Sequence, residues 1–172
     1  MEIKVSEIPT EGLKVELAGE PAEYSDLDED IKVSGPVKAK FSVKKLGGEV
    51  VYLSGELKTA LDLECSSCAK GYVMDVVSSF DLDLHPAVEL GKEDEKELHA
   101  ADMDVEYYEN DTVDLTAILR EQILLQAPIK ALCAEECKGL CQFCGKDLNT
   151  GPCDCEPPSG HPGLSGLKDF FK

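Results

Sequence analysis

The stretch VKAKFSVKKLGGEVVYLSGEL, residues 37–57, decides the fold. Apolar residues occupy every second position from Val37 to Val43, and mostly lysines lie between them. This period of two is typical of a β-strand with one apolar and one polar face. The Gly47–Gly48 pair indicates a hairpin turn, because glycine readily adopts the positive φ angles that tight hairpins require. The stretch therefore predicts two antiparallel strands.

The alternation continues on both sides of a second hairpin signal. Leu57, Leu61 and Leu63 fall on one face, and apolar side chains recur on one face from Tyr72 to Leu84. Proline at position 86 is expected to end this strand, because it cannot donate a ladder hydrogen bond. Cys65 and Cys68, in the segment between the two runs, are therefore predicted to lie at a hairpin tip.

Residues 111–128, DTVDLTAILREQILLQAP, favour a helix. Asp111 or Asp114 can cap its first turn by accepting hydrogen bonds from free backbone amides, and Pro128 ends it. We expect its apolar face to cover the sheet. The residues expected on that face are Leu115, Ile118, Leu119 and Leu125, with Ile123 at its edge.

These elements predict an α+β fold, an antiparallel β-sheet or partly open barrel packed against one main helix, followed by a cysteine-rich metal-binding C-terminal segment. The core domain is expected to span residues 1–130, with an acidic, solvated and partly mobile loop at about 87–112. The segment at 131–172 holds six of the eight cysteines. Its Pro- and Gly-rich end is expected to be extended, with a short turn or helix at 164–171.

The chain is strongly acidic. Its 17 Lys and Arg against 35 Asp and Glu give a net charge of −18, which repels nucleic acid over most of the surface and favours basic partners. Its first residues, MEIKVSEIPTEG, lack the features of a signal peptide, and no apolar run approaches the ~20 residues of a membrane span. We expect a soluble cytoplasmic protein, in which cysteines are better explained as metal ligands than as disulfides.

The C-terminal segment carries closely spaced thiols. Zinc binds four soft ligands in a tetrahedron, and CQFCG at 141–145 is typical of a knuckle in which two thiolates reach one ion. We expect a structural zinc ion bound by Cys137, Cys141, Cys144 and Cys155, with Cys133 and Cys153 as alternates. The six thiols could instead hold more than one ion or exchange places around one.

Such a site could be a purely structural staple for a tail with little core, or the base of a metal-dependent binding surface. Catalytic zinc is disfavoured, because it needs an open coordination position and usually a nearby base, and the nearest histidine in sequence is His161. An iron–sulfur cluster is an alternative, since thiolates alone can hold one. A disulfide framework would require an oxidising compartment.

The Cys65–Cys68 pair has three interpretations. It could be a redox pair, although such pairs usually precede a helix N-terminus, which lowers the thiol pKa. It could be a zinc knuckle that completes a ligand set with C-terminal thiols. It could also be a pair of reduced thiols at a hairpin tip. The sequence leaves these alternatives open.

Lysines form a stripe on one strand. Lys38, Lys40 and Lys44 project from the polar face, with Lys45 and Lys58 nearby. They are candidates for contacts with RNA phosphates, or they are simply the solvated face of a sheet. No catalytic triad, phosphate loop or dinucleotide fingerprint appears, so the sequence predicts neither an enzyme nor a small-molecule substrate.

Four motifs resemble the YceD family of bacterial large-subunit ribosomal RNA accumulation proteins. They are LECSSCAKGY at 63–72, VDLTAILREQILLQAPIKALC at 113–133, CKGLCQFCGKDLN at 137–149 followed by CDC, and the closing HPGLSGLKDF at 161–170. The third is the most specific. The sequence departs from the family at Ser66 and Ser67, where an arginine is common, and at Gly163 and Leu164, where an aromatic residue is usual.

The resemblance implies a non-enzymatic role in the accumulation or processing of large-subunit (23S) ribosomal RNA and in ribosome assembly. Because of the net charge of −18, we expect it to act through a basic ribosomal protein or a ribosomal precursor particle, and to meet ribosomal RNA only indirectly. One alternative is a thiol redox or metal-handling protein that uses the C-x-x-C pairs. A second is a generic acidic protein-interaction module.

Overall fold

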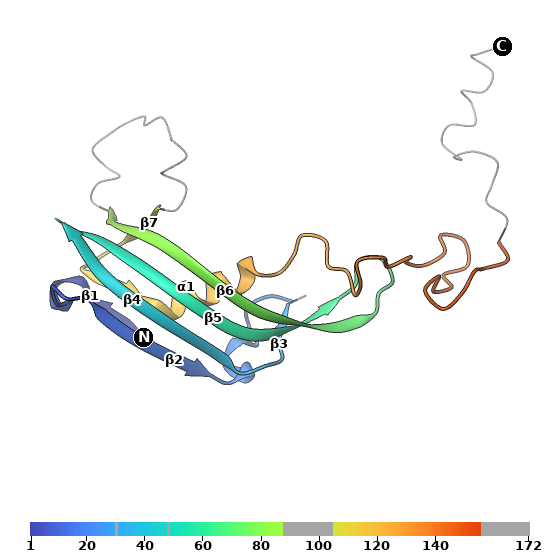
Figure 1. Ribbon diagram of the computed structural model, residues 1–172, viewed down its shortest axis with the longest axis horizontal. Coiled ribbons are helices and arrows are strands. Elements are labelled where there is room, and N and C mark those ends of the chain that lie inside the picture. The colour runs from blue at the N-terminus through green and yellow to red at the C-terminus, as the bar shows by residue number, and fades with distance from the viewer. Residues whose placement is uncertain (30, 48, 88–104, 156–172) are drawn as a thin grey trace, which may run out of the picture.

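The computed structural model describes residues 1–29, 31–47, 49–87 and 105–155. Two kinds of element dominate these residues, long β-strands and one α-helix (Figure 1). The elements are β1 (Glu2–Lys4), η1 (Val5–Glu7), β2 (Leu13–Gly19), η2 (Pro21–Tyr24), β3 (Lys32–Val33), β4 (Val37–Gly47), β5 (Val50–Glu64), β6 (Gly71–Pro86), β7 (Val105–Tyr108), β8 (Thr112–Asp114) and α1 (Leu115–Leu125). The prefix η marks a short 3-10 helix.

Six of the strands form one open sheet. Its order is β2-β4-β5-β6-β7, and β3 pairs with β5 beyond the first residues of β4. Neighbouring strands in this sheet pair antiparallel, except that β7 runs parallel to the end of β6. The two expected hairpins are thus confirmed, and β6 ends at Pro86 as expected. The expected α+β architecture is confirmed as an open sheet with one main helix.

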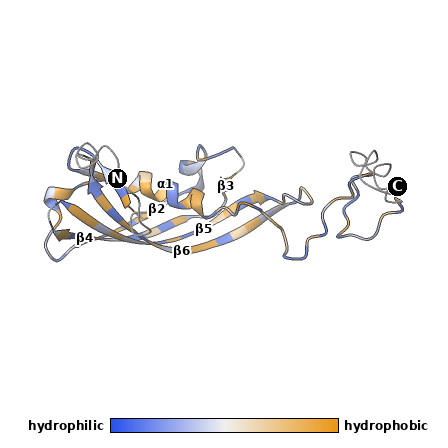
Figure 2. Ribbon diagram, turned by 90° about the horizontal axis from the view of Figure 1, so that it is seen from above, coloured by the Kyte–Doolittle hydropathy of each residue, from blue (hydrophilic) through white to orange (hydrophobic). Residues whose placement is uncertain are grey.

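The helix α1 lies against one face of the sheet (Figure 2). Asp114 is its N-cap, and its carboxylate accepts hydrogen bonds from the amides of Thr116 at 2.8 Å and Ala117 at 3.3 Å. Asp111 instead accepts a hydrogen bond from the amide of Ser6. Asp114, and not Asp111, is therefore the residue that caps the helix.

The buried face of α1 differs from the expected one at its last turn. Leu125 is 71% exposed, whereas Ile123 is fully buried. Gln122 is buried between the apolar positions of the helix. The expectation for Leu125 was wrong because the buried face is centred on Leu115, Leu119 and Gln122, which leaves Leu125 at the margin of the helical stripe, in the last turn of the helix.

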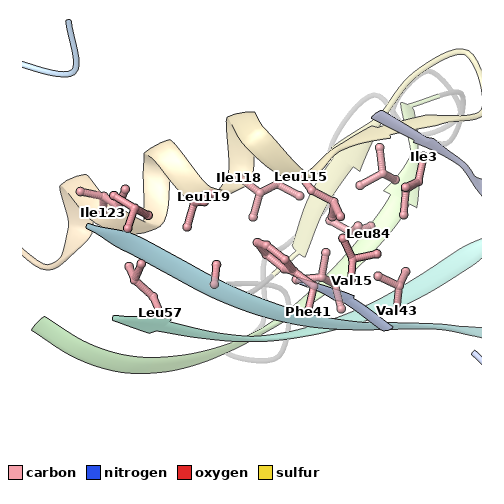
Figure 3. Packing of buried hydrophobic residues seen from close by; sticks show 14 of the residues in the cluster. Ile3, Val15, Phe41, Val43, Leu57, Leu84, Leu115, Ile118, Leu119 and Ile123 are labelled. Carbon is pink, nitrogen blue, oxygen red and sulfur yellow. The ribbon is translucent and has the colours of Figure 1, made fainter. Parts of the chain in front are cut away.

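The core lies between α1 and the inner face of the sheet (Figure 3). Alternate residues of β4 and β5 point into it, among them Phe41, Val43 and Leu57. Phe41 meets Phe80 of β6 edge to face, with ring centroids 6.1 Å apart. Gly55 lies between them in the pairing register, and a side chain there would overlap the Phe80 ring. The alternation in the sequence thus reflects one buried and one solvated face.

Part of the stretch expected to be an acidic loop is ordered. Residues 105–108 form β7, and β8 follows and pairs with β1 in a separate two-stranded sheet. The parts of that loop at 88–104, and the tail with the expected turn or helix at 164–171, lie outside the described residues. Among the described residues, no helix is both long and apolar enough to cross a membrane.

Candidate metal centres

Two thiol quartets are found in the described part of the chain. Cys65, Cys68, Cys133 and Cys137 form the hairpin quartet, and Cys141, Cys144, Cys153 and Cys155 form the tail quartet. Within each quartet the sulfur atoms all lie within 4.8 Å of one another. All eight cysteines are free thiols. Each quartet thus offers the four soft ligands of a tetrahedral metal site.

The hairpin quartet is built at the tip of β5 and β6, which reaches beyond the other strands (Figure 1). The turn is closed by hydrogen bonds from the amide of Cys65 to the carbonyl of Lys70 at 3.0 Å, and from Ala69 to Cys65 at 2.8 Å. Ala69 has a positive φ of 55°, which lets the chain reverse directly behind the pair. Both cysteines therefore face the same side of the tip.

The second pair of thiols is held against this tip by backbone contacts. The amide and the hydroxyl of Ser66 both donate to the carbonyl of Ala131, at 2.9 Å each. The amide of Leu140 donates to the carbonyl of Ser67 at 3.0 Å. These bonds bracket the segment that carries Cys133 and Cys137, and so they place its thiols beside those of the hairpin.

Gly139 makes this docking possible. Its φ is +70°, and a Cβ built on it would lie 2.8 Å from the carbonyl oxygen of Ser67. Glycine is the residue that adopts this conformation without a steric cost and permits such a close approach of two backbones. The glycine after Cys137 is thus a geometric requirement of the contact between the tail and the hairpin.

The sulfur separations match those of a thiolate metal site. Cys65 and Cys137 are 3.7 Å apart, and Cys68 and Cys133 are 3.6 Å apart. In the tail quartet Cys141 and Cys153 are 3.4 Å apart. Zinc–sulfur bonds of about 2.3 Å in a tetrahedron place the sulfurs about 3.8 Å from one another. Both quartets are therefore close to the dimensions that such an ion requires.

The tail quartet repeats the local turn of the hairpin quartet. Cys141 donates its amide proton to the carbonyl of Lys146 at 2.8 Å, and Gly145 donates to Cys141 at 2.9 Å. Gly145 has a positive φ of 70°, as Ala69 does in the first turn. The segments CSSCAK and CQFCGK thus form the same knuckle twice, once at the tip of a β-hairpin and once in the tail.

Backbone amides favour a thiolate at one cysteine of each knuckle. The amide of Cys133 is the largest influence that lowers the pKa of Cys65 to about 6. The amide of Cys144, followed by that of Phe143, lowers the pKa of Cys141 to about 6. Metals bind the thiolate form, so these donors prepare a ligand near neutral pH.

One further thiol of each quartet, Cys133 in the first and Cys155 in the second, resists a second negative charge. The hydrogen bond with Cys68 raises the pKa of Cys133 to about 12, and that with Cys144 raises the pKa of Cys155 to about 12. Four thiolates packed together repel one another, and a divalent cation at their centre would offset that repulsion. The quartets are therefore suited to a cation and poorly suited to remaining fully ionised without one.

The two quartets differ in their access to solvent. In the hairpin quartet Cys65 is 1% exposed and Cys68 is 7% exposed. In the tail quartet Cys141 is 8% exposed, whereas Cys144 is exposed. A closed, four-thiol site is typical of structural zinc, and catalytic sites keep one position open. The hairpin quartet has the more closed arrangement.

Comparison with known proteins adds a family. The family model described as "Large ribosomal RNA subunit accumulation protein YceD" matches residues 53–171. The chain belongs to the YceD family. The matched range includes most of β5, all of β6 and α1, and all eight cysteines. No solved structure matches the chain.

Curated relatives of this YceD protein come from plants and a bacterium. The chain is 31% identical over 160 residues to the "Large ribosomal RNA subunit accumulation protein YCED homolog 1, chloroplastic" of Zea mays, covering 80% of this chain and 54% of that protein. It is 27% identical to the Arabidopsis thaliana protein of the same name, covering 68% of this chain and 44% of that protein. The chain thus spans about half the length of these plant relatives.

A bacterial relative matches over nearly the whole of both chains. The "Uncharacterized protein YlbN" of Bacillus subtilis is 27% identical over 173 residues, which cover 98% of this chain and 94% of that protein. The sequence similarity to this relative therefore also covers the N-terminal strands, which lie outside the range of the family model.

The four expected zinc ligands of this YceD protein are divided between the two quartets. Cys137 lies in the hairpin quartet, whereas Cys141, Cys144 and Cys155 lie in the tail quartet. Cys153, one of the two alternates, completes the tail quartet, and the other alternate, Cys133, joins Cys137. One of the three interpretations of the Cys65–Cys68 pair was that it completes a ligand set with C-terminal thiols. The hairpin quartet has this geometry. Metal binding by any of these thiols stays a prediction.

Cys65 and Cys68 were missing from the expected ligand set. Two signals in the sequence point to them. Eight cysteines are enough for two complete tetrahedral sites, and CSSCAK and CQFCGK share the same spacing and the same following lysine. Each knuckle then needs two further thiols, and the chain order supplies Cys133 with Cys137 to one and Cys153 with Cys155 to the other.

The expected phosphate-contact lysines do not converge on one point. Lys38, Lys40 and Lys44 lie along the outer face of β4, away from the helix. Lys40 forms an ion pair with Glu16 at 3.0 Å, and Lys38 lies directly opposite Lys58 on β5. The arrangement is a basic stripe on one part of an acidic protein, and a role in RNA contact stays a prediction.

Proposed function

We propose that this chain is a non-enzymatic cytoplasmic factor that supports the accumulation or processing of large-subunit ribosomal RNA and the assembly of the ribosome. The observation that carries this proposal is the match of residues 53–171 to the YceD family model. The two plant relatives are named, with the label chloroplastic, for large ribosomal RNA subunit accumulation.

Zinc is the metal we propose for both quartets, with a structural role in each. Four cysteine ligands per site and the burial of the hairpin quartet support this choice. The hairpin quartet would join the tail to the sheet. The tail quartet would fold the segment at 141–155, where the described residues contain no helix or strand of a hydrophobic core. In such segments metal binding supplies the free energy of folding.

A basic ribosomal protein or a ribosomal precursor particle is the partner we propose. The net charge of −18 supports it, because such a protein repels free RNA over most of its surface and attracts basic proteins. The lysine stripe on β4 would be the point of contact with RNA phosphates within a particle whose proteins already offset the charge.

The test is depletion of the protein in the cells that make it. We expect the ratio of large-subunit to small-subunit ribosomal RNA to fall, and the wild-type protein to restore it and to co-sediment with large-subunit precursors. An unchanged ratio, or a protein that stays at the top of the gradient, would argue for a general acidic interaction module. If the purified protein bound large-subunit RNA tightly without any partner protein, this result would contradict the proposed partner.

A thiol redox role is the second candidate, because the pKa of Cys65 is lowered to about 6. A reactive cysteine must also be accessible, and Cys65 is 1% exposed. Alkylation of the metal-loaded protein distinguishes the roles. A structural ligand should react only after the metal is removed by a chelator, whereas a redox thiol should react in the loaded protein.

A further inference from the structure

Strand β6 has a long edge that no described strand covers. It pairs with β5 from Gly71 to Leu84, but β7 pairs with it only from Asp83 to Pro86. The backbone groups of residues 73–82 that point away from β5 therefore have no strand partner among the described residues. This part of β6 borders the sheet in Figure 1. It is long enough, at about 33 Å, to pair with an added strand.

This edge lacks several of the usual protections against added strands. Natural edge strands carry charged residues, above all lysine, or proline, or are interrupted by a bulge. Residues 73–82, VMDVVSSFDL, contain no lysine or proline, their charged residues are Asp75 and Asp81, and their register with β5 is unbroken. The opposite edge of the sheet, β2, is shorter, contains Lys14 and is followed by Pro21. The contrast indicates that the β6 edge is available for pairing.

The side chains along the edge have a defined pattern. On the inner face, Met74, Phe80 and Leu82 are only partly buried against the core. On the outer face, Val73 is 60% exposed and Val77 is 75% exposed. A strand beside β6 would thus find apolar contacts on both faces, and its backbone would complete the ladder.

The charge of the edge selects a basic occupant. β6 contains Asp75, Asp81 and Asp83 on its outer face and no Lys or Arg. The whole chain has a net charge of −18. A second copy of the chain would bring the same carboxylates together across the new pairing, which is unfavourable, whereas alternating Lys or Arg on an added strand would face them.

We propose that the edge of β6 at residues 73–82 binds an extended basic segment of a partner protein, which adds to the sheet as a further strand. The segment would place apolar side chains toward Met74 and Phe80 on the inner face, and Lys or Arg toward Asp75 and Asp81 on the outer face. This proposal deepens the function proposed above and rests on its basic protein partner. Strand addition draws affinity from backbone hydrogen bonds and specificity from alternate side chains.

The test uses the full, metal-loaded chain and a synthetic peptide of alternating arginine and valine that spans the edge. Its control replaces each valine by proline, which keeps the charge but removes backbone donors. We expect binding of the first peptide only, and slower hydrogen exchange of amides within 73–82. Val77→Lys should weaken binding about tenfold, because it adds a positive charge to the edge. Leu46→Lys, at a similarly exposed apolar position at the far end of β4, should leave it unchanged.

Several outcomes would overturn the proposal. These are equal binding of both peptides, no protection of 73–82, and equal effects of Val77→Lys and Leu46→Lys. A dimer that Val77→Lys dissociates in sedimentation would show that a second copy occupies the edge instead. Unfolding midpoints establish that both variants are folded. If the peptide fails to bind while depletion still lowers large-subunit RNA, this inference fails alone and the proposed function stands.

Discussion

At the scale of single residues, Glu106 on β7 is a carboxyl whose surroundings disfavour its charge. Partial burial is the main cause that raises its pKa to about 7, and the charge of Glu121 and a hydrogen bond with it add to the effect. The folded protein therefore binds more protons than the unfolded chain between the ordinary pKa of 4.5 and about 7. The contribution of Glu106 to stability is present below this window and is lost as the pH rises through it.

We predict that Glu106→Gln flattens this dependence. The free energy of unfolding of the wild type should fall relative to that of the variant as the pH rises from 5 to about 7, because the folded state must then ionise a partly buried carboxyl. Urea unfolding at a series of pH values measures the difference. Glu121→Gln is the matched control and should shift the window to lower pH. Parallel curves for the wild type and Glu106→Gln would show that Glu106 titrates normally.

A second residue-scale prediction concerns Gly55. A Cβ at this position would overlap the Phe80 ring, which packs against Phe41 over the glycine. Gly55→Ala should therefore lower the free energy of unfolding by about 1–3 kcal/mol, the usual cost of overpacking a core. Gly71→Ala, where nothing lies within 4 Å of the new Cβ, is the control. Equal urea midpoints for the two variants would contradict this prediction.

At the scale of elements, the contact between the hairpin tip and the tail depends on Gly139. Gly139→Ala should weaken the hairpin quartet, because alanine at a φ of +70° costs about 1–2 kcal/mol and its Cβ would displace the carbonyl of Ser67. We expect faster metal release to a chromogenic chelator than from the wild type. Gly71→Ala, at the start of β6 beside the same tip, should release metal at the wild-type rate. An unchanged rate in Gly139→Ala would mean that the docking does not support the site.

At the scale of the whole molecule, the two quartets predict two metal ions per chain. Elemental analysis of protein purified without added metal should find about two zinc ions and few reactive thiols. Cys65→Ser and Cys144→Ser should each remove one ion, and they should do so independently because the quartets share no ligand. A wild-type content of about one ion, which either variant loses, would instead support exchange of the thiols around one site. If the protein contained no metal and fewer than eight free thiols were counted, this result would support disulfide or redox chemistry.

Loss of the two sites should have different consequences. Cys65→Ser removes a ligand that joins the tail to β5, so it should free the segment at 131–155 from the sheet while β4 and β5 stay paired. Cys144→Ser should unfold the tail knuckle alone. Limited proteolysis distinguishes these results, because cleavage would begin near residue 131 in the first variant and beyond residue 140 in the second.

Much of the architecture followed from local patterns in the sequence. The alternation in 37–45 and 72–84 determined the strands, since the side-chain period of a strand is two and one face must be buried. The helix, its cap at Asp114 and the two C-x-x-C turns also depend on residues close to one another in the chain. Leu125 was placed wrongly because the helical period puts it at the margin of the apolar stripe, where the packing of the whole helix decides burial.

Only the tertiary structure decided how the thiols are grouped. Spacing alone allowed Cys137 to join the tail knuckle, but the bonds of Ser66 to Ala131 and of Leu140 to Ser67 bring it to a hairpin tip about seventy residues earlier in the chain. The parallel strand β7 and the open edge of β6 were decided in the same way. Local periodicity determines which elements form, whereas contacts between distant backbone groups depend on how those elements pack.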